Sequence, residues 1–149
     1  MPTEHRFTEP ASAAVDLTHA IAGRLAQAIA ARGVATMALS GGRSPRAMLE
    51  ALRDEALDWD KLIVTLVDER WVAPDHADSN ARLVRETLLQ GRAAAATFVP
   101  MWNDAPDPYA GQPACEAAIA AIPRPFDVML LGMGEDGHTA SLFPDAAEL

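Results

Sequence analysis

The sequence predicts an α/β fold built around a mainly parallel sheet. Three short apolar runs, at residues 34–39, 62–67 and 126–131, have the length and composition of strands covered on both faces. Stretches with apolar residues at helical spacing separate these runs along the chain. Strands that alternate with helices favour parallel pairing through right-handed crossovers, because each helix returns the chain to the same end of the sheet.

The first helix is expected over residues 10–32. Its apolar residues recur at helical spacing, at Val15, Ile21, Leu25, Ala28 and Ile29. Gly33 then ends the pattern in the manner of a C-terminal cap. After the strand at 34–39, a second helix is expected, with Ser44 as its N-cap and Pro45 at its first position.

The second half of the chain is expected to continue the alternation. A helix capped by Asp78 or Ser79 should follow the strand at 62–67 and end near Gly91. Residues 93–112 contain several prolines and are expected to be loose, apart from a short strand at 97–99.

A last helix is expected over 114–122, before the strand at 126–131. Cys115 lies among Ala and Glu residues in this helix and is expected to pack there rather than act as a nucleophile. As the one cysteine of the chain, it cannot form an internal disulfide, which agrees with a reducing, cytoplasmic environment.

Length and charge narrow the class of protein. The 149 residues fit a single domain, 1–149, and half of them are hydrophobic, which is enough for a sizeable core. The formal net charge of −9 disfavours nucleic acid and anionic membranes, because the field repels phosphate. No run approaches the roughly 20 apolar residues of a membrane span, and the first ten residues are too polar for a secretory signal.

Three polar segments follow the predicted strands: residues 40–44, 68–70 and 132–138. In open parallel sheets, ligands bind outside the carboxyl ends of the strands, where such segments converge. We therefore expect these three segments to form the site.

The first segment has the character of a phosphate loop. Gly41 and Gly42 allow backbone N–H groups to approach a ligand closely, while the hydroxyls of Ser40 and Ser44 and the charge of Arg43 would favour an anion. The segment lacks the lysine pattern of a Walker loop. A tight turn with a good helix cap would explain the same residues.

The second segment places three charges at the end of a buried strand. Neighbouring side chains at a strand end point to opposite sides, so Asp68 and Arg70 should face one way and Glu69 the other. Two of them could contact a substrate while the third braces the loop. A solvated charged turn is the alternative, but the following Trp71 favours partial burial.

The third segment contains a G-x-G-x-x-G pattern at Gly132, Gly134 and Gly137. A dinucleotide fingerprint needs a helix after the last glycine and an acidic residue about 20 positions further on. Pro144 interrupts any such helix, so this interpretation is poor.

His138 is the better clue in this segment. An imidazole titrates near neutral pH and suits general base catalysis, and a nearby carboxylate such as Asp136 can fix its tautomer. The other histidines, His5, His19 and His76, follow no buried strand and are expected to be structural.

Two other kinds of site are disfavoured. Metal binding is not expected, because no second histidine or cysteine stands at ligand spacing. A serine hydrolase is weakly supported, since the G-x-S-x-G elbow is absent. The residues thus indicate an enzyme that binds a phosphorylated small molecule and transfers a proton through His138.

The same segments resemble the 6-phosphogluconolactonase family. The matching stretches are LSGGRSP at 39–45, VDERWVAPDHADSNARL at 67–83 and LLGMGEDGHTASLFP at 130–144. This resemblance implies a three-layer α/β/α fold with a mainly parallel sheet, in a superfamily that also contains glucosamine-6-phosphate deaminase. It further implies hydrolysis of 6-phospho-D-glucono-1,5-lactone in the oxidative pentose phosphate pathway, without metal or organic cofactor.

The resemblance also assigns roles to residues. His138 corresponds to the general base that activates water, with Asp136 orienting it or contacting the sugar. Arg70 corresponds to an active-site arginine suited to the phosphate or the oxyanion, and Asp68 would hold sugar hydroxyls.

The remaining binding residues lie in the two glycine loops. Gly41, Gly42 and Ser44, with Ser40, would cradle the phosphate, whereas Arg43 is assigned by its charge alone. Gly134 and Gly137 are expected at the substrate, in the turn before the histidine.

Two alternatives stay open. The deaminase binds a related sugar phosphate, but its relatives carry an acidic residue at the position of Phe143 and usually an aromatic one at that of Arg70. The second alternative is an inactive remnant that binds sugar phosphates, because family members continue beyond the histidine motif and this chain is expected to lack their C-terminal part. A sheet edge left uncovered in this way could allow self-association.

Overall fold

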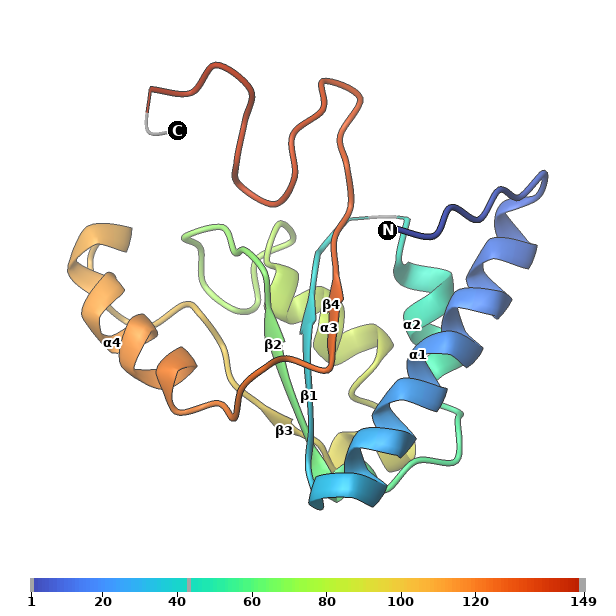
Figure 1. The fold of residues 1–149 in the computed structure, drawn as a ribbon. Helices are drawn as coiled ribbons and strands as arrows, with labels where there is room; N and C mark the ends of the chain where they lie inside the picture. The colour runs from blue at the N-terminus through green and yellow to red at the C-terminus, as the bar shows by residue number, and fades with distance from the viewer. Residues whose placement is uncertain (1, 43, 148–149) are drawn as a thin grey trace.

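A four-stranded sheet forms the centre of the computed structural model, which describes residues 2–42 and 44–147 (Figure 1). Its strands are β1 (Ala35–Leu39), β2 (Leu62–Leu66), β3 (Thr97–Phe98) and β4 (Val128–Leu130). They lie in the order β3-β2-β1-β4, and each pairing is parallel. The predicted α/β class with a parallel sheet is therefore confirmed.

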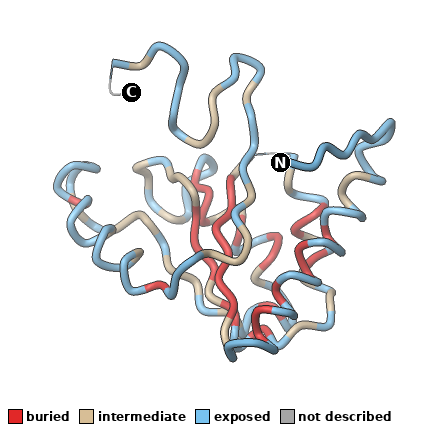
Figure 2. Tube along the Cα trace, in the orientation of Figure 1, coloured by how far each residue is buried: buried red, intermediate tan, exposed pale blue. Residues whose placement is uncertain are grey.

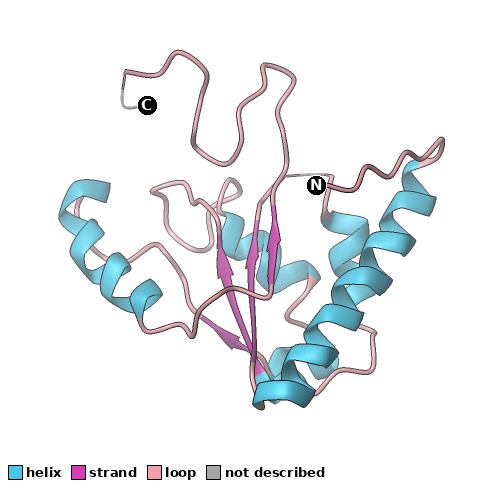
Figure 3. Cartoon of the chain, in the orientation of Figure 1, coloured by secondary structure: helices cyan, strands magenta, loops and turns pink. Residues whose placement is uncertain are grey.

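The described residues also form four α-helices and two short 3₁₀ turns, and all of these except the first helix lie between strands along the chain (Figure 3). The helices are α1 (Pro10–Arg32), α2 (Arg46–Leu52), α3 (Asn80–Thr87) and α4 (Pro108–Ala120), and the 3₁₀ turns are η1 (Trp59–Lys61) and η2 (Gly91–Ala95). In Figure 1, α4 lies on the left and α1 on the right, with the sheet between them. Within the described residues, no helix is long and apolar enough to cross a membrane.

The core lies between the sheet and helices α1, α2 and α3. On β1, the alternate residues Ala35, Met37 and Leu39 are fully buried and join this core, as period-2 alternation requires. Figure 2 shows the buried residues concentrated in the central strands and the facing side of α1. Both faces of β1 are buried, which is expected of a central strand in a parallel sheet.

The predicted ends of two helices are confirmed. Gly33 follows α1 with a left-handed φ of 75°, and its N–H donates to the carbonyl of Ile29 at 2.7 Å. Ser79 caps α3 and accepts a hydrogen bond from the N–H of Arg82 at 3.2 Å. That helix ends at Thr87, earlier than the expected end near Gly91.

Two expected helix starts were wrong. Ser44 does not cap α2, because the helix begins one step later with Pro45 as its N-cap and without a side-chain capping bond. The last helix begins at Pro108 rather than at residue 114. Asp107 caps it by accepting from the N–H of Ala110 at 2.9 Å, and Pro108 occupies a first-turn position that needs no N–H donor.

The strand at 126–131 was expected to be buried, and this was also wrong. β4 is shorter and lies at the edge of the sheet, with Met129 52% and Leu131 51% exposed. Val15, expected on the apolar face of the first helix, is likewise half exposed. An apolar run gives no information on the order of strands in the sheet, so the edge position could not be read from it.

Candidate functional site

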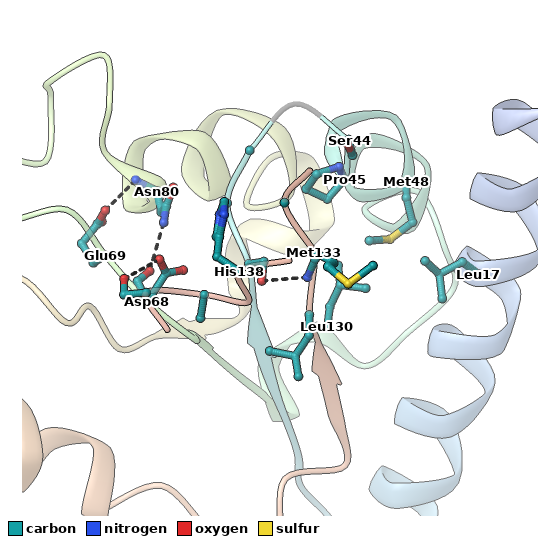
Figure 4. A pocket seen from close by; sticks show the side chains of 18 of the residues that line it. Leu17, Ser44, Pro45, Met48, Asp68, Glu69, Asn80, Leu130, Met133 and His138 are labelled. Atoms are coloured by element: carbon teal, nitrogen blue, oxygen red, sulfur yellow. Dashed lines mark hydrogen bonds between the residues drawn. The ribbon is translucent and has the colours of Figure 1, made fainter. Parts of the chain in front are cut away.

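A pocket of about 820 Å³ opens at the carboxyl ends of β1, β2 and β4 (Figure 4). The three segments expected to form the site meet there. The predicted site residues that line it are Ser40, Gly41, Gly42, Ser44, Asp68, Arg70, Gly134 and His138. Asp136 and Gly137 lie in the same turn as His138 but do not line the pocket, and Arg43 lies outside the described residues.

The glycine loop after β1 is fastened to the loop after β4. The N–H of Ser40 donates to the carbonyl of Leu130 at 3.1 Å, and its hydroxyl accepts from the N–H of Gly132 at 3.3 Å. Gly42 has a φ of 97°, which strongly favours glycine at this position. The two loops therefore border the pocket as one connected rim.

All three residues of the charged triplet after β2 line the pocket. The carboxylate of Glu69 accepts hydrogen bonds from the N–H groups of Asn80 at 2.7 Å and Ala81 at 2.8 Å, and from the hydroxyl of Ser79 at 3.2 Å. A carboxylate at the first turn of a helix satisfies donors that have no partner within the helix. Glu69 is thus the residue that braces the loop.

The other two charges of the triplet are held by neighbouring loops. The hydroxyl of Ser141 donates to Oδ2 of Asp68 at 2.9 Å, which ties the histidine loop to β2. Nη1 of Arg70 donates to the carbonyl of Asp78 at 2.8 Å and to Oδ1 of Asn80 at 2.7 Å. Arg70 is otherwise exposed, so its guanidinium is oriented while still accessible to an anion.

Asn80 is a pocket residue to which the sequence analysis assigned no role. It is the first residue of α3, is 3% exposed and lines the pocket. In the sequence it is simply the residue after a predicted cap. The available signal was its place inside the family-like stretch 67–83, close to Asp68 and Arg70.

His138 is held by contacts on two sides. Its Nδ1 lies 2.5 Å from Oδ1 of Asp136, and its ring stacks on Phe143 with centroids 4.5 Å apart. A Cβ at Gly134 would lie 2.2 Å from the imidazole, so glycine is needed there for the ring to fit. Gly137, with a φ of 87°, supplies the left-handed turn before the histidine.

The contact between His138 and Asp136 affects the charge of the carboxyl group. The hydrogen bond from the imidazole lowers the pKa of Asp136, so this carboxyl is ionised at neutral pH. In the tautomer that carries its proton on Nδ1, this N–H donates to Asp136 and Nε2 carries no proton.

Much of the pocket wall is apolar, and its larger apolar residues are Leu17 of α1, Met48 of α2, Leu130, Met133 and Phe143. Figure 4 shows Leu17 and Met48 across the pocket from Glu69 and Asn80. A pocket with a few convergent polar groups on a largely apolar wall is typical of small-molecule sites.

Two further observations concern a cysteine nucleophile and a metal site. Burial raises the pKa of Cys115 in α4, which disfavours the thiolate that a nucleophile needs. Among the described residues, no group of three or more His, Cys, Asp or Glu side chains is placed to hold a metal ion.

Comparisons with known proteins identify relatives of this chain. The family model for glucosamine-6-phosphate isomerases/6-phosphogluconolactonase matches residues 8–149. The chain is 50% identical to a 6-phosphogluconolactonase of Pseudomonas aeruginosa, over 87% of this chain and 54% of that protein. It is 46% identical to one of Rhizobium meliloti, over 97% of this chain and 62% of that protein.

Solved structures extend the similarity to the fold. A 6-phosphogluconolactonase of Shewanella baltica superposes with a TM-score of 0.93 at 44% identity, over 95% of this chain and 61% of that one. One of Trypanosoma brucei has a TM-score of 0.80 at 26% identity, over 99% of this chain and 65% of that one. The chain thus spans less than two thirds of the length of these relatives. With the family model matched from residue 8 onward, it belongs to the glucosamine-6-phosphate isomerase/6-phosphogluconolactonase family.

Proposed function

We propose that this protein hydrolyses 6-phospho-D-glucono-1,5-lactone to 6-phospho-D-gluconate. The observation that carries the proposal is that His138, whose ring contacts Asp136, lines the same pocket as the glycine loop at Gly41 and Gly42. The proposed proton acceptor and a set of backbone donors would thus lie on one rim. The relatives named above are 6-phosphogluconolactonases, which supports this choice of substrate.

In the proposed reaction His138 acts first as a base. Nε2 takes a proton from water as the water oxygen attacks the lactone carbonyl carbon, and the carbonyl oxygen becomes an oxyanion. Arg70 lines the pocket and would stabilise this negative charge or the phosphate. The carbon–oxygen bond of the ring then breaks, the imidazolium returns the proton to the leaving oxygen, and the carboxyl product forms.

Binding is assigned to the other loops. The backbone of Gly41 and Gly42 and the hydroxyls of Ser40 and Ser44 would hold the phosphate. Asp68 would accept hydrogen bonds from sugar hydroxyls in place of the one it now receives from Ser141. The backbone of Gly134 would border the sugar ring, while Gly137 would act through the turn that places the histidine.

A hydrolysis assay tests the proposal. Purified protein is mixed with freshly prepared lactone, and acid release is followed against the spontaneous rate, while binding of 6-phosphogluconate is measured by calorimetry. Acceleration above the spontaneous rate supports the lactonase. Binding without acceleration would instead identify a sugar-phosphate-binding protein without activity.

The amine chemistry of the deaminase is disfavoured by one contact. Phe143 stacks on the imidazole, at the position where deaminase relatives carry an acidic residue. An apolar ring there cannot exchange a proton with the histidine. Release of ammonia from glucosamine 6-phosphate, measured with the same preparation, would contradict the lactonase assignment.

The proposal also covers the setting of the enzyme, that is, its compartment, partners and cofactors. We propose that it acts on a small sugar phosphate in the cytoplasm, without a nucleic acid or membrane partner and without a cofactor. The excess of negative charge and the single cysteine support this setting. Self-association through the edge strand β4 is proposed as well, because Met129 and Leu131 are exposed there.

A further inference from the structure

The side chain of Asn80 connects two charged residues of the pocket, Arg70 and Asp68. Its Oδ1 accepts from Nη1 of Arg70 at 2.7 Å, and its Nδ2 donates to the backbone carbonyl of Asp68 at 3.0 Å. At 3% exposure, this amide is shielded from water while both of its ends are used. The orientation of the amide is therefore fixed, because a flip would place like groups against each other at both ends.

The glycine loop packs against the same amide. A Cβ added at Gly41 would lie 1.8 Å from Oδ1 of Asn80, so the loop backbone lies in direct contact with this side chain. One residue thus contacts the loop after β1 and two residues of the loop after β2. Figure 4 shows Asn80 next to Glu69 and Asp68 at the pocket.

The backbone of Asn80 is held as firmly as its side chain. Glu69 accepts its N–H at 2.7 Å through Oε1 and that of Ala81 at 2.8 Å through Oε2. Oε1 also accepts the N–H of Arg70 at 2.8 Å. The carboxylate therefore fixes the start of α3 relative to the arginine that Asn80 contacts.

We propose that Asn80 is a positioning residue that holds the Arg70 guanidinium at the pocket without cancelling its charge. The effect of Asn80 on the kinetics rests on the proposed function. An aspartate of the same shape would hold Arg70 in an ion pair and place a negative charge beside an anionic substrate. The neutral amide orients the guanidinium and leaves its full charge for the substrate.

Kinetics on three variants test the proposal. With 6-phosphogluconolactone, Asn80→Ala is expected to lower kcat/KM by about 10- to 100-fold, the loss typical of a hydrogen bond to a charged group. Asn80→Asp should raise KM more than it lowers kcat, because the added charge repels the substrate before the reaction. Asn103→Ala is the matched control, since this asparagine also donates its amide to a backbone carbonyl, that of Gly111, but does not line the pocket.

A double-mutant cycle separates positioning from general damage. If Asn80 acts through Arg70, Asn80→Ala should have less than about a twofold effect on kcat/KM when Arg70 is already alanine. Equal effects in both backgrounds would overturn the proposal. So would an Asn80→Asp variant that binds and reacts as well as the unmodified protein.

A spectroscopic experiment tests the positioning role of Asn80 without relying on enzyme activity. In protein labelled with ¹⁵N-arginine, the Nη groups of Arg70, assigned with the Arg70→Lys variant, should rotate slowly because Nη1 is hydrogen bonded. Asn80→Ala and Asn80→Ser should speed this rotation, although the bond from Nη1 to the carbonyl of Asp78 remains, and folding is checked by circular dichroism. Unchanged rotation would overturn the positioning role. Absence of lactone hydrolysis by the unmodified protein would count against the proposed function alone, and the rotation would still decide the role of Asn80.

Discussion

Nδ1 of His138 lies 2.5 Å from Oδ1 of Asp136, and the N–H of His138 also donates to that oxygen at 3.2 Å. One carboxylate oxygen therefore holds both the ring and the backbone of the histidine. The arrangement fixes the imidazole within a turn of five residues that begins at Gly134, whose N–H donates to the carbonyl of His138.

Replacing the histidine should stop the reaction and spare binding. We expect His138→Ala to reduce kcat by about 10²- to 10⁴-fold, the contribution of a general base, with little change in 6-phosphogluconate affinity. Steady-state hydrolysis and calorimetry measure the two effects. His19→Ala is the control, because His19 is exposed on α1 and does not line the pocket. Full activity in the His138 variant would remove the proposed base.

The carboxyl of Asp136 should titrate below its ordinary pKa of about 3.9. The hydrogen bond from His138 lowers this pKa, so any stability from the pair is present above the unfolded value and is lost as pH falls through the folded one. The carboxyl should thus be ionised above about pH 4, and its contribution to the pair should decline only below that pH. Carboxyl ¹³C shifts followed by NMR should show the lowered pKa in the unmodified protein and its return in His138→Ala.

Removing the charge of Asp136 should weaken catalysis less than removing the base. In Asp136→Asn the amide oxygen can still accept from Nδ1, but the competing NH₂ group favours other ring orientations. We expect kcat to fall by about 10- to 100-fold, which is less than the loss of the base itself. A variant with unchanged kcat would show that the carboxylate does not orient the ring.

Gly134→Ala should displace the imidazole. The new methyl would lie 2.2 Å from the ring, so His138 must move and kcat should fall by at least about tenfold, since small displacements of a catalytic group are costly. Gly23→Ala is the control, since Gly23 does not line the pocket and a Cβ there meets nothing within 4 Å. Equal kcat values for the two variants would contradict the fitted position of the ring.

Self-association should depend on β4. We expect sedimentation velocity to show an association that strengthens with concentration and that Met129→Lys weakens, because a charge on an edge strand opposes pairing with another copy. Val15→Lys changes a similarly exposed apolar residue on α1 and should leave the association intact. A monomer at all concentrations would refute the prediction.

The sequence was sufficient to predict the elements that depend on local signals. Apolar runs identified the strands within a residue or two, and Gly33 and Ser79 marked helix ends through backbone conformation and a capping hydroxyl. The convergence of the three loops followed from the parallel order alone, because parallel strands all deliver their carboxyl ends to one edge.

Features that depend on tertiary contacts were not predictable in this way. The exposure of Met129 depends on which strand lies at the edge, and periodicity carries no such information. The contacts of Asn80 with Arg70 and Gly41 join residues that no local pattern relates. At Pro108 the local signal, an aspartate before a proline, was present but was outweighed by the surrounding prolines.

Because β4 is a short edge strand, the site should open more easily than the core of the sheet. β4 is joined to β1 over the registers Met37–Val128, Ala38–Met129 and Leu39–Leu130, and the histidine turn follows directly from it. Fraying of these few backbone bonds would carry the imidazole away while the buried strands β1 and β2 stay folded. Amide hydrogen exchange should therefore be much faster in β4 than in β1, and warming should abolish turnover before the far-ultraviolet spectrum changes.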